Sequence, residues 1–417
     1  MNSQVFCGAK VPASRQMANR SDQVIVALLP LLLGGELLLW IVLLPVGMRG
    51  DADFAMFYTA GSMVRAGYAH QIYNYDAETR FQSELVSKTP APYTHLPYEA
   101  LLFAPLSVLP YRVAYCTFLL LNLGLAISAL FLMPRADVHW LSALTVASFF
   151  PVSAAIADGQ DSIFLLIIAC AAWFLFSRKQ EWFAGNLLAL GLFRFQIVLP
   201  IAGLMFLWKR WRFVAGFVMS TAALLVLSGW LAGFDQLAVY GSHLLSLSTV
   251  TRQETGYSIS QSQARRMVSL RALFVNILPS AHIAQAITLL ASIALLIWVA
   301  HRGRLLGRKY QFALAVAFSV LVSYHLFVYD LTILLIPMIA ALELAGNGKS
   351  RTAHAAVLIP LLATPVGILW RPFLLALPLL AFLYMIARAF HGLLAKGREE
   401  FAKASVAVPI VRLGAPL

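Results

Sequence analysis

The sequence predicts an all-α protein that crosses a membrane many times. Of its 417 residues, 60% are hydrophobic and only 12% are charged, whereas about a quarter of the residues of a soluble domain are charged. The mean hydropathy is +0.79, and several apolar runs are long enough to cross roughly 30 Å of hydrocarbon. We therefore expect a bundle of about 11–12 membrane helices that includes one short helical hairpin.

The basic charge and the cysteines exclude several classes of protein. The net charge is +13, but Lys and Arg collect in short loops between apolar runs, which is typical of the positive-inside rule and not of nucleic-acid binding. Cys7, Cys116 and Cys170 have neither metal-ligand nor redox spacing. No P-loop, dinucleotide-binding glycine fingerprint or HExxH motif is present. The sequence thus predicts no nucleotide-driven pump, no zinc protease, no cofactor and no metal site.

Loop charges predict the topology. Lys10, Arg15 and Arg20 precede the first apolar run, which places the N-terminus in the cytoplasm. Alternating the later runs brings the C-terminus to the same side, so we expect a multi-pass protein of the cell (inner) membrane. The predicted parts are a cytoplasmic tail over 1–23, a transmembrane domain over 24–392 with extracytoplasmic loops at 47–110 and 232–271, and a cytoplasmic tail over 393–417.

Each predicted element follows from an apolar run or a proline. The run 24–46 is the first membrane helix, and 55–65 and 76–86 are helices that lie along the surface. Pro97 favours a helix start, and the apolar stretch 98–109 is too short to span. The later expected helices are 111–133, 140–157, 162–177, 182–208 (two halves), 211–231, 272–300, 311–326, 331–344, 355–369 and 372–389.

The run 182–208 has cation clusters at both ends, Arg178-Lys179 and Lys209-Arg210. A single crossing would leave one cluster outside, whereas a hairpin of two short helices keeps both in the cytoplasm. We therefore predict a hairpin broken near Arg194 and Gln196. Arg194 then lies at its tip, at membrane depth, where an isolated charge is costly and is a functional candidate.

This topology gathers polar groups on the extracytoplasmic face. Arginine binds phosphate with a planar fork of donors, and a carboxylate can take a proton from an attacking hydroxyl, so the set suits an anionic, lipid-linked substrate. Simpler interpretations stay open: Asp51 as a solvated helix end, Arg265 and Arg266 as headgroup contacts, and His325 as a satisfied interfacial histidine. The candidates are Asp51, Asp53, His95, Gln160, Arg194, Gln196, Arg265, Arg266, His325 and Asp330, with Tyr93, Asp158 and Asp161 nearby.

Several motifs, in order, resemble glycosyltransferase family 87 (the DUF2029 group), from the first apolar run to about Ala340. Two positions depart from the family pattern: Tyr98 stands where a second proline is usual, and Arg194 stands where lysine is common. The matching segments are Asp53-Phe54 with Phe57-Tyr58 and Ala60, Ala66-Gly67, Tyr73 to Asp76, Pro97 to Leu106, Gly159-Gln160, Ala184-Gly185 to Pro200, Met267 to Arg271, and Ser323 to Asp330.

The resemblance implies a GT-C type membrane glycosyltransferase, similar to the polyprenyl-phosphate-mannose-dependent α-mannosyltransferases. It implies that Asp53 is the general base and that His325 and Asp330 lie near the donor phosphate. The sequence leaves open whether Asp51, the second catalytic candidate, shares the role of base. Our hypothesis is an inverting, metal-independent transfer of a hexose from a polyprenyl-phosphate sugar to a glycolipid or glycan acceptor. The alternative is a transporter or flippase of lipid-linked sugars. The sequence leaves open the sugar, the acceptor, the linkage and the oligomeric state.

Overall fold

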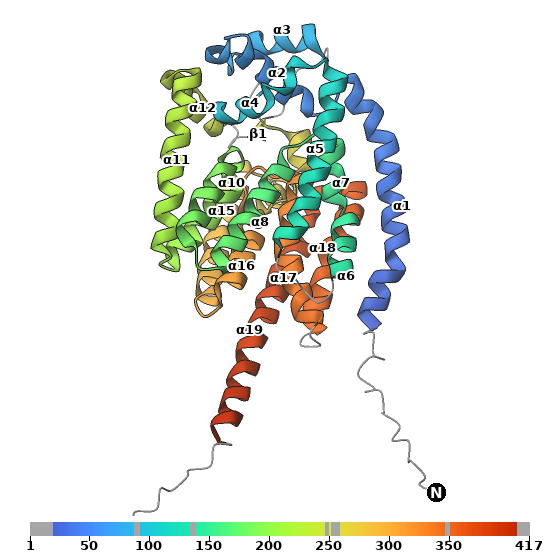
Figure 1. Ribbon diagram of the computed structural model, residues 1–417, viewed down its shortest axis with the longest axis vertical. Coiled ribbons are helices and arrows are strands. Elements are labelled where there is room, and N and C mark those ends of the chain that lie inside the picture. The colour runs from blue at the N-terminus through green and yellow to red at the C-terminus, as the bar shows by residue number, and fades with distance from the viewer. Residues whose placement is uncertain are drawn as a thin grey trace, which may run out of the picture.

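The computed structural model describes residues 20–86, 92–133, 139–246, 250–251, 259–346 and 351–406. The protein is an all-α polytopic bundle (Figure 1). Among the described residues, the exceptions to helix and loop are two strands of two residues each, β1 (Val250–Thr251) and β2 (Ile259–Ser260), which pair in parallel. Seven described segments are long and apolar enough to cross a membrane, and shorter apolar helices such as α8 (Ser162–Ser177) accompany them.

Most expected helices form within a few residues of their predicted bounds. The predicted tail 1–23 falls largely outside the described residues. The first half of the chain contains α1 (Arg20–Arg49), α2 (Phe54–Arg65), α3 (Tyr75–Leu85), α4 (Pro97–Phe103), α5 (Tyr111–Leu132), α6 (His139–Ala147), α7 (Phe150–Ala157), α8, α9 (Glu181–Ala189) and α10 (Phe195–Leu207). The second half contains α11 (Trp211–Ala232), α12 (Phe234–Ser246), α13 (Gln261–Arg266), α14 (Leu270–Ile277), α15 (Ala281–Gly303), α16 (Arg308–Val322), α17 (Leu335–Gly346), α18 (Arg351–Trp370) and α19 (Ala376–Val406).

The helices run between two ends of the bundle (Figure 1). The start of α1 and the end of α19 lie at the same end, while α2, α3 and α4 cover the opposite end. Large apolar side chains face outward along α1 and α5; Leu31 is 74% exposed and Phe131 is 82% exposed. Such a surface is unsuited to water and fits contact with lipid tails.

Prolines explain why two predicted helices are divided. The expected helix 140–157 breaks into α6 and α7 because Pro151 has no N–H to donate to Ala147 four residues earlier. The expected helix 272–300 becomes α14 and α15 because Pro279 keeps the preceding Leu278 extended, with φ −99° and ψ 144°. Helix α19 continues to Val406, so its last turns occupy much of the range expected to be a tail.

The predicted hairpin is confirmed by an ion pair that joins its two ends. Nη1 of Arg210 lies 3.4 Å from Oε1 of Glu181, although a straight 27-residue helix would hold its ends roughly 40 Å apart. The chain therefore enters through α9, reverses in the 3₁₀ turn η4 (Leu190–Arg194) and returns through α10. Gly185 allows α9 to approach α11, since a Cβ there would overlap the carbonyl of Phe213. Arg194 stands at the apex.

Candidate active site

Asp53 lies in the short connection between α1 and α2, against the loop that joins α7 to α8. The backbone N–H of Phe54 donates to the carbonyl oxygen of Asp158 at 3.3 Å, and the N–H of Asp53 donates to Oδ1 of Asp158 at 3.4 Å. Gly159 makes this approach possible: its φ is +65°, and a Cβ would overlap Cβ of Phe54. These contacts fix the position of Asp53.

Two side chains donate hydrogen bonds to one oxygen of Asp53. Gln160 donates from Nε2 to Oδ2, and the hydroxyl of Tyr329 donates to the same Oδ2 at 3.3 Å. Among the described residues, no donor reaches Oδ1. The carboxylate is therefore held through Oδ2, while Oδ1 accepts no hydrogen bond from a described residue.

Arg194 links the loop that holds Gln160 to the 3₁₀ segment η5 (Val328–Leu334). Its Nε donates to Oδ1 of Asp161 at 2.9 Å, and its Nη2 donates to Oε1 of Gln160 at 2.6 Å. Its Nη1 lies 3.4 Å from Oδ1 of Asp330. The guanidinium is buried, with 5% exposure, and it is satisfied by protein groups.

Asp330 is fixed by further donors. Ser162 donates from its hydroxyl to Oδ1 at 3.0 Å, and the backbone N–H of Phe327 donates to Oδ2 at 2.9 Å. Asp330 is buried at 1% exposure. It thus acts as a counter-ion of Arg194 inside the protein, with both oxygens already engaged.

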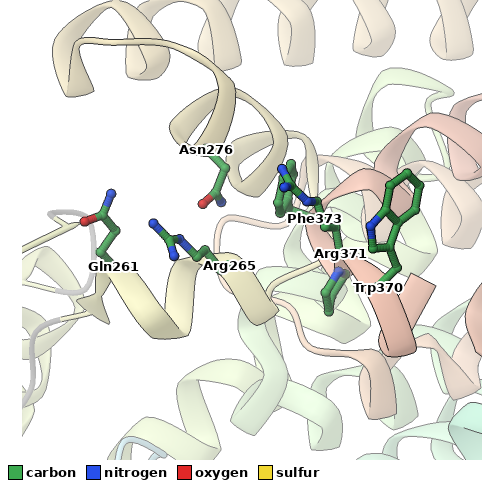
Figure 2. A pocket seen from close by; sticks show the side chains of 7 residues that line it. Gln261, Arg265, Asn276, Trp370, Arg371 and Phe373 are labelled. Carbon is green, nitrogen blue, oxygen red and sulfur yellow. The ribbon is translucent and has the colours of Figure 1, made fainter. Parts of the chain in front are cut away.

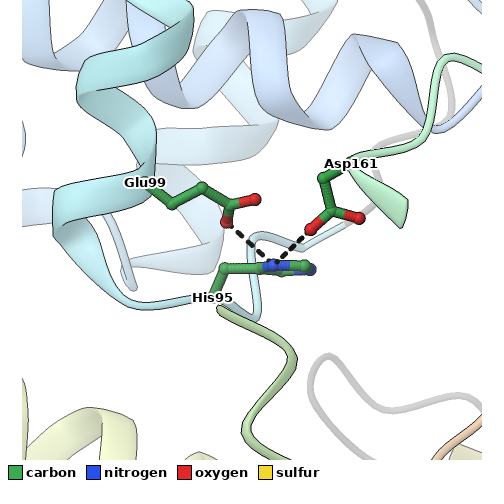
Figure 3. Close-up of side chains that lie close together, drawn as sticks. All are labelled: His95, Glu99 and Asp161. Atoms are coloured by element: carbon green, nitrogen blue, oxygen red, sulfur yellow. Dashed lines mark ion pairs between the residues drawn. The ribbon is translucent and has the colours of Figure 1, made fainter. Parts of the chain in front are cut away.

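His95 lies beneath two carboxylates, those of Glu99 and Asp161 (Figure 3). Its Nδ1 is 2.8 Å from Oε2 of Glu99 and 3.4 Å from Oδ2 of Asp161. Phe57 packs edge-on against the imidazole. Burial is the main reason that the pKa of His95 is lowered to about 4, so the ring is neutral near pH 7.

The remaining predicted residues have separate surroundings. His325 packs edge-on against Phe327, with ring centroids 5.0 Å apart; burial, with smaller effects of Arg194 and Arg271, lowers the pKa of its imidazole to about 3. Gln196 is buried on the first turn of α10. Asp51 has a side chain 51% exposed and lies 3.6 Å from Arg49.

Arg265 lines a pocket, whereas its neighbour Arg266 is exposed outside the lining. The pocket has a volume of about 390 Å³. Figure 2 shows Arg265 and Arg371 at this pocket on two different elements, α13 and the connection after α18. No described acidic residue forms an ion pair with either cation. The other lining residues are Gln261, Asn276, Trp370, Pro372 and Phe373.

One element that lines the pocket, α13, is connected to the segment that contacts Asp53. The N–H of Val268, just after α13, donates to the carbonyl of Leu326 at 3.0 Å, and Tyr329 three residues later contacts Asp53. A backbone hydrogen bond thus connects the segment after α13, whose Arg265 lines the cationic pocket, to the segment whose Tyr329 contacts Asp53. This arrangement suits a substrate with an anionic group and a reacting hydroxyl.

The family model for glycosyltransferase family 87 matches residues 93–323, which is more than half of the chain. The chain belongs to glycosyltransferase family 87. It is accordingly a membrane glycosyltransferase, with a sugar donor, an acceptor and a lipid environment. No curated protein and no solved structure matches it.

The matched range contains His95, Gln160, Arg194 and Arg265, but it begins after Asp53 and ends before His325. The carboxylate at the centre of the site therefore rests on the geometry described above. Sequence reasoning named Asp161 beside Gln160 but did not single out Tyr329, Glu99 or Arg371, which the structure adds to this neighbourhood. Tyr329, Glu99 and Asp161 join the network, and Arg371 joins the pocket. Among these residues, only Asp161 could be recognised from the sequence, because it directly follows the candidate Gln160.

Proposed function

We propose that this protein transfers a hexose, mannose-like, from a polyprenyl-phosphate sugar to a glycolipid or glycan acceptor on the extracytoplasmic face. Asp53 acts as the general base, and the anomeric configuration inverts. The observation that carries the proposal is the Asp53 carboxylate itself: Oδ2 accepts from Gln160 and Tyr329, while no described donor reaches Oδ1. A carboxylate positioned in this way can take the proton of an acceptor hydroxyl.

The reaction needs one base. The acceptor oxygen attacks the anomeric carbon as Asp53 takes its proton, the bond from that carbon to the phosphate oxygen breaks, and the lipid phosphate leaves with the electron pair. Because a phosphate leaving group is already a stable anion, no general acid is required. The side chain of Asp51 is half exposed and pairs with Arg49, so we assign the role of base to Asp53 alone.

The donor phosphate is proposed to bind in the pocket of Arg265 and Arg371 (Figure 2). Both cations are without described acidic partners, and arginine matches the geometry of a phosphate. Leu369 and Trp370, next to Arg371, are 88% and 74% exposed. Such side chains fit the lipid interface, so a polyprenyl chain can reach the pocket from the bilayer. Arg194, by contrast, already uses its donors within the protein.

The test places purified protein in liposomes with radiolabelled polyprenyl-phosphate sugars and a membrane glycolipid extract. Wild type, Asp53→Asn and the matched control Asp51→Asn are run side by side. We expect label in a new product with wild type and Asp51→Asn, and a loss of roughly 100-fold or more with Asp53→Asn. NMR of the product should show an anomeric configuration opposite to that of the donor.

Two outcomes would overturn the proposal. Full transfer activity of a correctly folded Asp53→Asn variant would show that Asp53 is not the general base. Movement of labelled donor across the bilayer without any product, equal in wild type and Asp53→Asn, would indicate the transporter instead.

A further inference from the structure

We propose that His95, Glu99 and Asp161 bind a divalent transition-metal cation, of the class of Mn²⁺ or Zn²⁺. One ligand atom from each residue lies within 4.8 Å of the other two (Figure 3). All three side chains are buried, with exposures of 5%, 0% and 1%. The site is distinct from Asp53, and this proposal does not depend on the sugar donor or on the base.

The first argument is that the cluster has more acceptors than donors. His95 Nδ1, Glu99 Oε1 and Asp161 Oδ2 are buried and have no hydrogen-bond partner among the described residues. Two carboxylate oxygens converge on one imidazole nitrogen, at 2.8 and 3.4 Å. A single N–H cannot serve both oxygens, and buried polar groups without partners are costly. A cation among the three would accept lone pairs from His95 Nδ1, from Asp161 Oδ2 and from the Glu99 carboxylate.

The second argument is charge. Glu99, Asp161 and Asp330 are three carboxylates with at most 1% exposure, and Arg194 is the buried guanidinium that faces them. With all three ionised, this group carries two negative charges in excess. Buried charges in proteins are paired or coordinate metals, and a divalent cation would neutralise the excess.

The ligand types and their supports favour a transition metal. Imidazole suits zinc and related metals, and carboxylates suit manganese as well. Tyr93 donates from its hydroxyl to Oε2 of Glu99 at 3.2 Å, and Arg194 holds Oδ1 of Asp161, which leaves Oδ2 directed to His95. Supporting bonds of this kind orient metal ligands.

The positions of the ligands indicate a structural role. His95 lies two residues before α4 and Glu99 lies in the first turn of that helix, and Asp161 precedes α8. A cation would therefore join the segment at the start of α4 to the loop before α8 that carries Gln160. The sequence could not indicate this, because 62 residues separate Glu99 from Asp161 and only the i, i+4 pair resembles a motif.

The experiment uses full-length, untagged protein in detergent, stripped with EDTA and dialysed. Mn²⁺ is then titrated with detection by electron paramagnetic resonance, and Zn²⁺ is titrated with detection by elemental analysis after gel filtration. We expect about one equivalent of either ion and a rise in the unfolding temperature of at least about 3 °C. The variants Glu99→Gln and His95→Gln should bind less than a tenth of an equivalent while eluting as folded protein.

Glu181→Gln is the matched control, since Glu181 is also a buried carboxylate (8% exposed) but lies at the end of the hairpin opposite to Arg194. This variant should still bind about one equivalent of metal. The proposal fails if wild type takes up neither ion at 100-fold molar excess, because a proton then occupies the space between the carboxylates. It fails as well if both ligand variants retain the metal.

Discussion

Gln160 presents its amide nitrogen to Asp53 although 107 residues separate the two in sequence. The orientation of the amide is determined by Arg194, which is only a donor and therefore takes Oε1 of Gln160. The Nε2 group must then face Asp53. One buried guanidinium thus sets the direction of the hydrogen bond that holds the proposed base.

Replacing Gln160 should lower the turnover number without preventing folding. In Gln160→Ala, Asp53 keeps the hydrogen bond from Tyr329 but loses the one from Gln160, so we expect kcat to fall roughly 10- to 100-fold with little change in KM for the donor. Tyr329→Phe, which removes the other donor to Oδ2, should also lower kcat. Steady-state transfer in liposomes measures both. A Gln160→Ala enzyme within twofold of wild type would show that the bond does not position the base.

Removing the charge of Arg194 should destabilise the bundle. Arg194→Met leaves Asp161 and Asp330 buried without their counter-ion, and loss of one partner from a buried ion pair costs about 3–5 kcal/mol of unfolding free energy. Equilibrium unfolding in mixed micelles, followed by tryptophan fluorescence, measures the change. The control Arg178→Met removes an exposed arginine that lies over the ring of Phe174 and should cost about 0.5 kcal/mol or less.

The sequence allowed the membrane helices to be predicted because apolar length and loop charge are local signals. The same signals identified the hairpin. The cation clusters at both ends of the apolar run required the two ends to lie on the same side, and the ion pair between Arg210 and Glu181 joins those ends. Prolines were harder: Pro151 and Pro279 divide helices whose hydropathy is continuous. Their effect is on one backbone hydrogen bond or one preceding residue, which an average over an apolar run does not register.

The site was predictable as a set of polar residues but not as a network. Asp53, Gln160, Arg194 and Asp330 were chosen individually, and the structure joins them through bonds between segments far apart in the chain. The sequence identified Arg194 as a functional candidate but did not indicate that Asp161 would engage its donors. Which of two carboxylates faces a cation depends on the packing of loops, and the sequence carries no signal for that.

His325 should make the protein less stable as the pH falls from 7 to 5. Burial lowers the pKa of its imidazole to about 3, whereas an unfolded histidine titrates near 6.5. Below about pH 6.5 the unfolded chain binds a proton that the folded protein does not, so stability is full above that pH and falls as the pH decreases. His325→Gln removes this group, and its unfolding free energy should change less between pH 7 and 5 than that of wild type. Parallel slopes for the two proteins would contradict the buried, neutral state.

Arg371 and Arg265 should govern the affinity for the donor, while Arg266 should not. A hydrogen bond to a charged group is worth about 1.5–3 kcal/mol, so Arg371→Gln and Arg265→Gln should each raise KM for a polyprenyl-phosphate sugar by roughly 10- to 100-fold. Arg266→Gln is the matched control, because Arg266 adjoins Arg265 on the same short helix but does not line the pocket. Transfer rates at several donor concentrations separate KM from kcat.

If all three variants raised KM equally and high salt abolished the differences, the arginines would attract the anionic donor only at long range, and the phosphate would have to bind elsewhere. If only the two lining residues mattered, the pocket would be the donor phosphate site.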